Sequence, residues 1–283
     1  MSEPLWHACP PDPDCRYCRG LGGGADWSFL DAVYCISLQE RPDRAAGAAA
    51  ELHRVGLCRL ATFLRPARHP RKGIVGCWES HRLVGMRALE EGQQRVLILE
   101  DDVRFDAGID AATTTRIRAA LATLPGDWQI FFLGHWPLRA WFVAPGVLRT
   151  RSGCAHAYIA SPRLLRWLRD HPWSKRGAAT NPLVGRGIDA AYACLSATYA
   201  LYPMIAVQAA GRSDNSTAAQ KRARKNKARW RHLVTHSRHR EWLLARLMRP
   251  AEHAVAWLSP LFRLLEERQV RRHLTLVSRG PRT

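Results

Sequence analysis

Residues 96–102 read VLILEDD, four aliphatic residues followed at once by three acidic ones. An aliphatic run of this length predicts a buried strand, and the acidic triplet Glu100-Asp101-Asp102 lies at its carboxyl end. In open α/β sheets, ligands bind beyond that end of the strands. Carboxylates placed there can hold a hard divalent cation, which prefers oxygen ligands. Acidic residues after a strand also cap helices or face water, so the triplet alone leaves both readings open.

The direction of the three side chains follows from strand geometry. Successive residues of a strand point to opposite faces, so Glu100 and Asp102 are expected on one face and Asp101 on the other if the strand persists. If the triplet binds a metal ion, Asp102 and Glu100 are therefore the expected ligands. A cation held by them would neutralise the charge that builds on a departing diphosphate.

The segments before the triplet alternate between the hydrophobic pattern of a strand and that of a helix. Residues 32–38 and 60–64 predict short buried strands. Between them lies an Ala-rich helix that Asp43 could cap and that runs to about Val55, and residues 77–91 predict a second helix. Strand, helix, strand, helix, strand with short connections predicts a single Rossmann-like α/β domain with a mostly parallel sheet.

The segments after the triplet continue this pattern with less regularity. Strands are predicted at 130–133, 155–160 and 200–207, a hairpin around Phe142 and Val147, and helices at 162–170 and 188–196. We divide the chain into an irregular leader rich in Cys, Pro and Gly (1–30), a catalytic domain (31–215) and a basic helical extension (216–283).

Composition and charge narrow the function classes. Of the 283 residues 47% are hydrophobic, which excludes a wholly disordered chain. The formal net charge of +19 favours a polyanionic partner. Residues 220–231 are rich in Lys and Arg, and Trp242 and Trp257 follow beside an apolar stripe at helical spacing. This extension could contact an anionic membrane surface, bind nucleic acid, or pack on the domain.

The chain shows neither a secretory signal nor an apolar run long enough for a membrane span. We expect a cytoplasmic protein, peripheral on the inner face of the membrane, with its cysteines reduced. Near the N-terminus, His7, Cys9, Cys15 and Cys18 form a cluster that could bind structural zinc. Zinc sites usually have a longer spacer between two ligand pairs, so reduced thiols in the leader are the alternative.

Several blocks resemble glycosyltransferase family 25, which includes bacterial lipopolysaccharide glycosyltransferases and relatives of the procollagen galactosyltransferases. The blocks lie in the family's order at residues 34–44, 73–81, 97–103, 153–161 and 202–214. Two positions depart from its pattern, with Ser37 where the family has Asn and Asn215 where it commonly has Ile.

The resemblance implies a GT-A-type fold and an inverting transfer of a hexose, such as galactose. The donor would be a UDP-sugar, the cofactor Mn²⁺ or Mg²⁺, and the acceptor a glycan or glycolipid such as lipopolysaccharide. Arg41 and Arg44 would contact the donor together with Glu100 and Asp101, because Arg pairs with phosphate. His81 would shape the donor site from behind.

An inverting transfer also needs a base that takes the proton of the acceptor hydroxyl. Asp189 is the first choice and Asp214 the second, although Asp189 could simply cap the helix that follows it. The alternative function is a nucleic-acid- or membrane-binding protein that uses the basic extension and has an inactive transferase fold. Nucleic acid is the less favoured partner, since no zinc-finger or RNA-binding aromatic motif accompanies the basic run.

Overall fold

A computed structural model describes residues 5–21, 24–70, 72–174, 180–181 and 185–209 of the chain. Asp214 and the predicted basic extension (216–283) lie outside these residues. Among the residues described, no helix is both long enough and apolar enough to cross a membrane.

The centre of the molecule is a sheet of seven strands in the order β1-β3-β2-β4-β7-β10-β6. Their bounds are β1 Trp6–Ala8, β2 Ala32–Ile36, β3 Ala61–Leu64, β4 Val96–Glu100, β6 Ile130–Ala144, β7 Val147–Ala160 and β10 Thr198–Leu201. Strand β2 runs parallel to both β3 and β4, and β10 runs parallel to β6, whereas the remaining neighbours are antiparallel. The sheet is therefore mixed. The prediction of a mostly parallel sheet was wrong, because the hairpin β6–β7 returns antiparallel beside β4.

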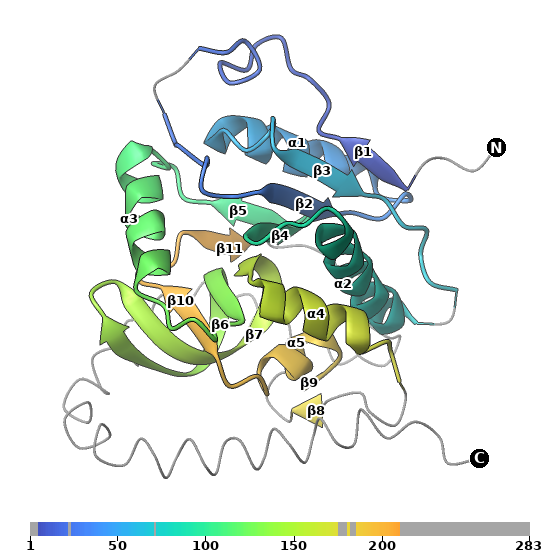
Figure 1. Ribbon diagram of the computed structural model, residues 1–283. Coiled ribbons are helices and arrows are strands. Elements are labelled where there is room, and N and C mark those ends of the chain that lie inside the picture. The colour runs from blue at the N-terminus through green and yellow to red at the C-terminus, as the bar shows by residue number, and fades with distance from the viewer. Residues whose placement is uncertain (1–4, 22–23, 71, 175–179, 182–184, 210–283) are drawn as a thin grey trace, which may run out of the picture.

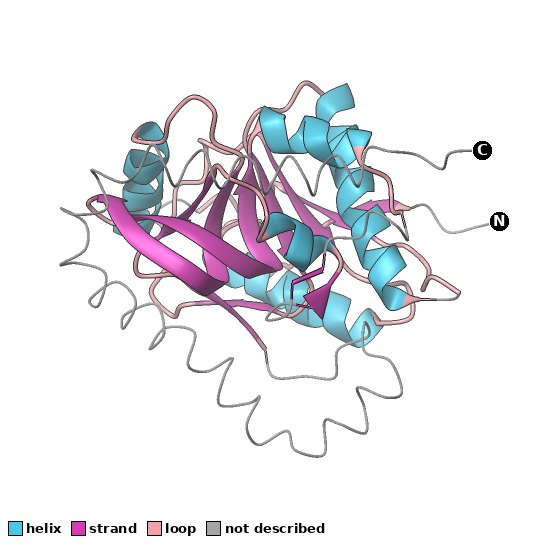
Figure 2. Ribbon diagram, turned by 90° about the horizontal axis from the view of Figure 1, so that it is seen from below, coloured by secondary structure: helices cyan, strands magenta, loops and turns pink. Residues whose placement is uncertain are grey.

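Helices cover both faces of this sheet (Figure 2). Their bounds are α1 Pro42–Val55, α2 Gly73–Glu90, α3 Ala111–Ala122, α4 Pro162–Asp170 and α5 Ile188–Tyr192. In Figure 1, α2, α4 and α5 gather on one face. Alternate strand residues feed two separate cores: Val33 and Leu97 pack with α1 and α3, while Tyr34 and Ile98 pack with α2, α4 and α5. This alternation is what a strand covered on both faces requires.

The first half of the domain follows the sequence prediction closely. The chain passes from β2 through α1 to β3, then through α2 to β4 on the other side of β2. Helix α1 begins at Pro42, so Asp43 lies in its first turn instead of capping it, and Gly56 ends it with a φ of 78°. Because α1 and α2 lie on opposite faces, the strand order reverses between β2 and β4. A crevice at the carboxyl ends of two such strands is the usual ligand site of open α/β sheets.

The second half departs from the prediction. The strands expected at 130–133 and 155–160 merge with the expected hairpin into the long pair β6–β7. The strand expected at 200–207 divides into β10 and β11 (Ala206–Gln208), and β11 pairs with β5 (Val103–Phe105). Helix α3 was not predicted, and β8 (Thr180–Asn181) and β9 (Gly185–Arg186) form a small separate sheet.

The leader is less irregular than expected. Strand β1 pairs with β3 at the edge of the sheet, and Cys9, Cys15 and Trp27 are buried in the core beside α1. The indole N–H of Trp27 donates to the carbonyl oxygen of Val55 at 2.8 Å. Residues before the first βαβ unit thus complete one of its two cores.

Gly134 on β6 is needed for a close approach of backbones, and its replacement should be costly. A Cβ there would overlap the carbonyl oxygen of Ala206 on β11 and the ring of His156. We expect Gly134→Ala to lower the free energy of unfolding by roughly 3 kcal/mol, because the backbone of β11 must move. Urea unfolding measures this loss. Gly108→Ala, whose Cβ meets no atom within 4 Å, is the control and should change stability little. Equal stability of the two variants would contradict the packing of β11 against β6.

Candidate functional site

The acidic triplet lies where the strand order reverses. Glu100 is the last residue of β4, and Asp101 and Asp102 form the turn before β5. Ser37, which follows β2, donates its hydroxyl to Asp101 Oδ2 at 2.9 Å, and Arg65, which follows β3, donates to Ser37 Oγ at 3.1 Å. The carboxyl ends of three parallel strands are thereby joined through side chains.

Arg44, in the first turns of α1, is the cation closest to the triplet. Its Nη1 donates to Asp101 Oδ1 at 2.9 Å and lies 3.6 Å from Asp102 Oδ2. Because β4 ends at Glu100, the alternation expected through the triplet stops there. Arg44 therefore contacts both aspartates, while Glu100 has a different set of neighbours.

Glu100 is contacted by groups from two other elements, α2 and β11. Its Oε1 lies 3.9 Å from Cys77 Sγ and 3.6 Å from His81 Nε2, both on α2. Its Oε2 accepts a hydrogen bond of 3.3 Å from Gln208 on β11. These contacts fix the position of the Glu100 carboxylate.

The positive charge near Glu100, Asp101 and Asp102 does not offset the effects of their burial and mutual repulsion. Burial, with the charge of Asp101, raises the pKa of Glu100 to about 7. Burial and the charge of Glu100 raise the pKa of Asp102 to about 7, and burial also raises the pKa of Asp101. Arg44 opposes all three shifts without cancelling them. An added cation would stabilise the ionised forms.

The donor set also fits a hard cation. Oδ1 of Asp102 is buried and has no hydrogen-bond partner among the described residues. A buried carboxylate oxygen without a partner is costly, and a divalent ion that takes oxygen ligands would satisfy it. Glu100 and Asp102 could therefore hold Mn²⁺ or Mg²⁺, and their role as metal ligands stays a prediction.

His81 is fully buried behind Glu100. Its Nδ1 lies 2.8 Å from the hydroxyl of Tyr158, which in turn lies 2.7 Å from the hydroxyl of Tyr192. Burial lowers the pKa of His81 to about 4, so the ring is neutral at pH 7. His81 has no exposed surface and lies beside Glu100, so it would influence a bound ligand through that carboxylate. The sequence prediction gave it such an indirect role.

Asp189, the second residue of α5, faces the same group of charges. Its Oδ1 accepts a hydrogen bond of 2.8 Å from the backbone N–H of Ala155 on β7. Burial, then the charge of Glu100, raises its pKa to about 6. The capping residue of α5 is Gly187, so the alternative role of Asp189 as the cap is not what the structure shows. A carboxylate with this pKa can accept a proton near neutral pH.

Arg41 takes a different position from Arg44. It forms two hydrogen bonds to Asp43, at 2.9 and 2.8 Å, on the surface at the start of α1. Its charge still opposes the rise in the pKa of Asp101. Of the two arginines, Arg44 is the one that contacts the triplet directly.

Neither Cys77 nor Cys154 was singled out from the sequence as a site residue, and both border the acidic site. Cys154, on β7, is the one described non-glycine residue with a positive φ, 69°. Besides burial, the charges of Asp189, Glu100 and Asp102 raise its pKa. Strained backbone of this kind is concentrated at functional sites, but the sequence carries no signal for it.

The predicted zinc residues are divided in the structure. Cys15 and Cys18 lie together, but with His53 and Cys58. His7, on β1, is outside this group, and the sulfur of Cys9 lies 3.9 Å from the far nitrogen of the His53 ring.

Comparison with known proteins finds a relative by sequence. A stretch of 131 residues, 38% of the chain, is 28% identical to the human protein named "Inactive glycosyltransferase 25 family member 3". The chain is similar, over that stretch, to a glycosyltransferase 25 family member. The match covers 22% of the relative, so the chain spans about a fifth of its length. No family model matches the chain.

A solved structure, A197 from STIV, aligns with 64% of this chain and 86% of its own length. The sequence identity is 12% and the TM-score 0.38, a likeness too low to support any statement about fold or function.

Proposed function

We propose that the protein is an inverting glycosyltransferase that moves a hexose, such as galactose, from a UDP-sugar to a glycan or glycolipid acceptor, such as lipopolysaccharide. The observation that carries the proposal is the cluster of Glu100, Asp101 and Asp102 where the strand order reverses. Within the described part of the chain, a buried oxygen of Asp102 has no hydrogen-bond partner. The sequence similarity to a glycosyltransferase 25 family member supports it.

The chemistry assigns a role to each group. Glu100 and Asp102 would hold Mn²⁺ or Mg²⁺, which supplies positive charge to the diphosphate as it leaves. Arg44 lies 2.9 Å from Asp101 and 3.6 Å from Asp102, and it would turn to the phosphates when the cation takes its place beside Asp102.

Asp189 would act as the base. The acceptor oxygen attacks the anomeric carbon while the bond from that carbon to the diphosphate oxygen breaks. The hydroxyl proton passes to Asp189, and the nucleoside diphosphate leaves with the bonding electron pair. Backbone hydrogen bonds from Ala155 and Cys154 would hold the Asp189 carboxylate in position for this step. Asp214, the second candidate, lies outside the described residues.

The competing function is a fold that binds a ligand without transfer. The human relative is itself named inactive, which keeps this alternative in view. The basic extension (216–283) is the ground for the proposals of contact with an anionic membrane surface and a cytoplasmic, peripheral location. It would also be the ground for nucleic-acid binding, which we do not favour.

A thermal-shift screen of nucleotide sugars with and without Mn²⁺ tests the proposed function. We expect a UDP-hexose at about 100 times its Kd to raise the melting temperature by roughly 5–10 °C, and only with the metal. The same mixtures with glycan acceptors are then assayed for release of UDP. Metal-dependent binding without release would favour the inactive fold, and the absence of any nucleotide-sugar shift would contradict the proposal.

A further inference from the structure

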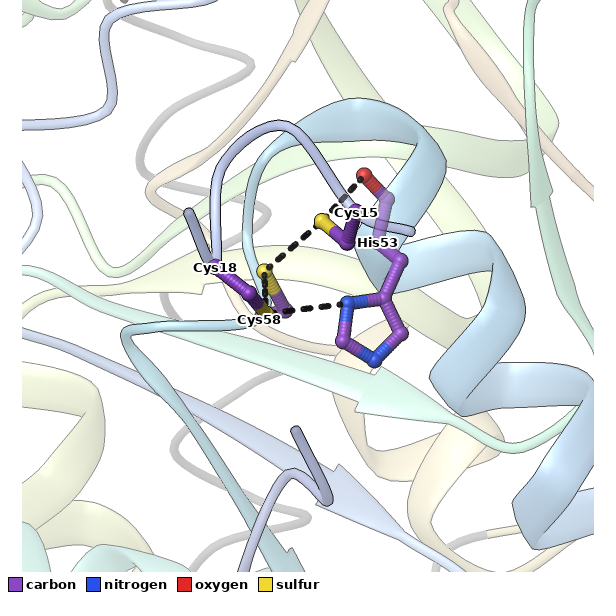
Figure 3. Close-up of side chains that lie close together, drawn as sticks. All are labelled: Cys15, Cys18, His53 and Cys58. Atoms are coloured by element: carbon purple, nitrogen blue, oxygen red, sulfur yellow. Dashed lines mark hydrogen bonds between the residues drawn. The ribbon is translucent and has the colours of Figure 1, made fainter. Parts of the chain in front are cut away.

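A second cluster of metal-ligand side chains lies far from the acidic site in the fold. Cys15 and Cys18 come from the leader, His53 from the last turn of α1, and Cys58 from the loop before β3. Figure 3 shows the three sulfurs and the His53 ring turned toward one another. One atom from each side chain lies within 4.8 Å of the other three.

Three of the six distances between ligand atoms in the cluster match those of a tetrahedral site. Cys58 Sγ lies 3.8 Å from Cys15 Sγ and 3.6 Å from Cys18 Sγ, and Cys18 Sγ lies 3.5 Å from His53 Nδ1. In a tetrahedron around zinc, with metal–sulfur and metal–nitrogen bonds of about 2.3 and 2.05 Å, two sulfurs are about 3.8 Å apart and a sulfur and a nitrogen about 3.6 Å apart. None of the cysteines is disulfide-bonded.

The His53 ring is oriented for binding through Nδ1. Its other nitrogen, Nε2, lies 3.0 Å from the carbonyl oxygen of Pro10 and donates to it. This hydrogen bond places the proton on Nε2 and leaves the lone pair of Nδ1 directed at the sulfurs. Metal-binding histidines usually donate their second nitrogen to such a partner.

We propose that Cys15, Cys18, His53 and Cys58 bind a structural zinc ion. Three thiolates and one imidazole are soft and borderline ligands, which select Zn²⁺ over Mn²⁺ or Mg²⁺. Four protein ligands leave no position for water or substrate, as in structural sites. The ligand set differs from the one predicted from sequence, because His53 and Cys58 take the places of His7 and Cys9.

The position of the cluster gives the ion a mechanical role. It joins the leader to the end of α1 whose opposite end carries Arg44. Next to it, the ring of Tyr17 packs against Gly56, where an added Cβ would come within 2.6 Å of the ring. Zinc here would hold the leader and α1 together, and loss of the ion should loosen both.

The first test uses the whole protein, purified without chelator. We expect one zinc per chain by elemental analysis, and release of that zinc when a mercurial reagent titrates the thiols. Removing it should lower the melting temperature by roughly 10 °C, and added Zn²⁺ should restore it. Substitution with Co²⁺ should give the visible bands of a tetrahedral site and charge-transfer bands from thiolate.

Variants then identify the ligands. His53→Ala and Cys58→Ser should weaken zinc binding by roughly tenfold or more. Cys9→Ser and His7→Ala are the matched controls and should keep one zinc per chain. Asp102→Asn should also keep it, which separates this site from the proposed catalytic one. Where a ligand variant fails to fold, mercurial release from the wild-type protein still reports the ligands as thiolates.

Three results would overturn the proposal. One is a native protein that neither contains zinc nor takes it up after reduction. Another is loss of the metal from Cys9→Ser or His7→Ala but not from His53→Ala, which would return the ligand set predicted from sequence. The third is a disulfide from Cys58 to Cys15 or Cys18, found by alkylation and mass spectrometry of the native protein.

Discussion

Asp102→Asn should abolish sugar transfer, with a loss of roughly 1,000-fold or more, and should remove the metal dependence of donor binding. Asn has the shape of Asp but no charge, so it is a poor ligand for a divalent ion. The oxygen that lacks a hydrogen-bond partner in the structure, Asp102 Oδ1, is the one expected to bind the metal.

The same change should leave the fold intact. Burial and the charge of Glu100 raise the pKa of Asp102 to about 7, so its ionised form is disfavoured in the folded protein. Removing the charge relieves that repulsion, and the melting temperature should stay level or rise. Asp127→Asn, at an exposed ion pair with Arg163, is the control and should affect neither activity nor stability. Substantial transfer by folded Asp102→Asn would remove the central claim.

Asp189→Asn should slow transfer by about 100-fold or more while leaving donor affinity unchanged. The amide oxygen of Asn can still accept the hydrogen bond from Ala155, so the side chain keeps its position but cannot take a proton. Single-turnover kinetics and donor titration separate the two quantities.

Asp189→Ala provides the comparison. It should be as slow as Asp189→Asn, but also less stable, because the N–H of Ala155 loses its acceptor. A fall in donor affinity in both variants would make Asp189 a binding residue, and Asp214 would become the favoured base.

The parts of the fold that sequence predicted well are those fixed by local pattern. The strands ending at Ile36 and Glu100 and the helix ending at Gly56 each carry a continuous apolar run or a glycine stop. The hairpin around Phe142 and Val147 was predicted, but its full length was missed because Pro137 and Arg139 interrupt the apolar pattern of β6. Helix α3 was missed because its Thr and Ala residues give little amphipathic contrast.

The same difference between local pattern and long-range contact applies to the site residues. The triplet was predicted because it follows a recognisable strand, and Arg44 because the block around it resembles glycosyltransferase family 25. Gln208 was noted only within a motif, and its contact with Glu100 depends on β11 crossing to β5. His53 and Cys58 lie 35 and 40 residues after Cys18, and the pairing of β1 with β3 brings the leader to them. Spacing along the chain carries no sign of that pairing.

Strand β11 also determines when, during synthesis of the chain, the acidic site can acquire all its hydrogen bonds. The N–H of Ala209 donates to the carbonyl of Asp102 at 2.6 Å, and Gln208 donates to Glu100. All seven strands of the main sheet precede these two residues in the chain. A nascent chain that has emerged only to β10 can therefore build the sheet while its carboxylate cluster still lacks both donors. Premature termination just before Ala206 would therefore leave Glu100 without Gln208, and the carbonyl of Asp102 without Ala209, as hydrogen-bond donors.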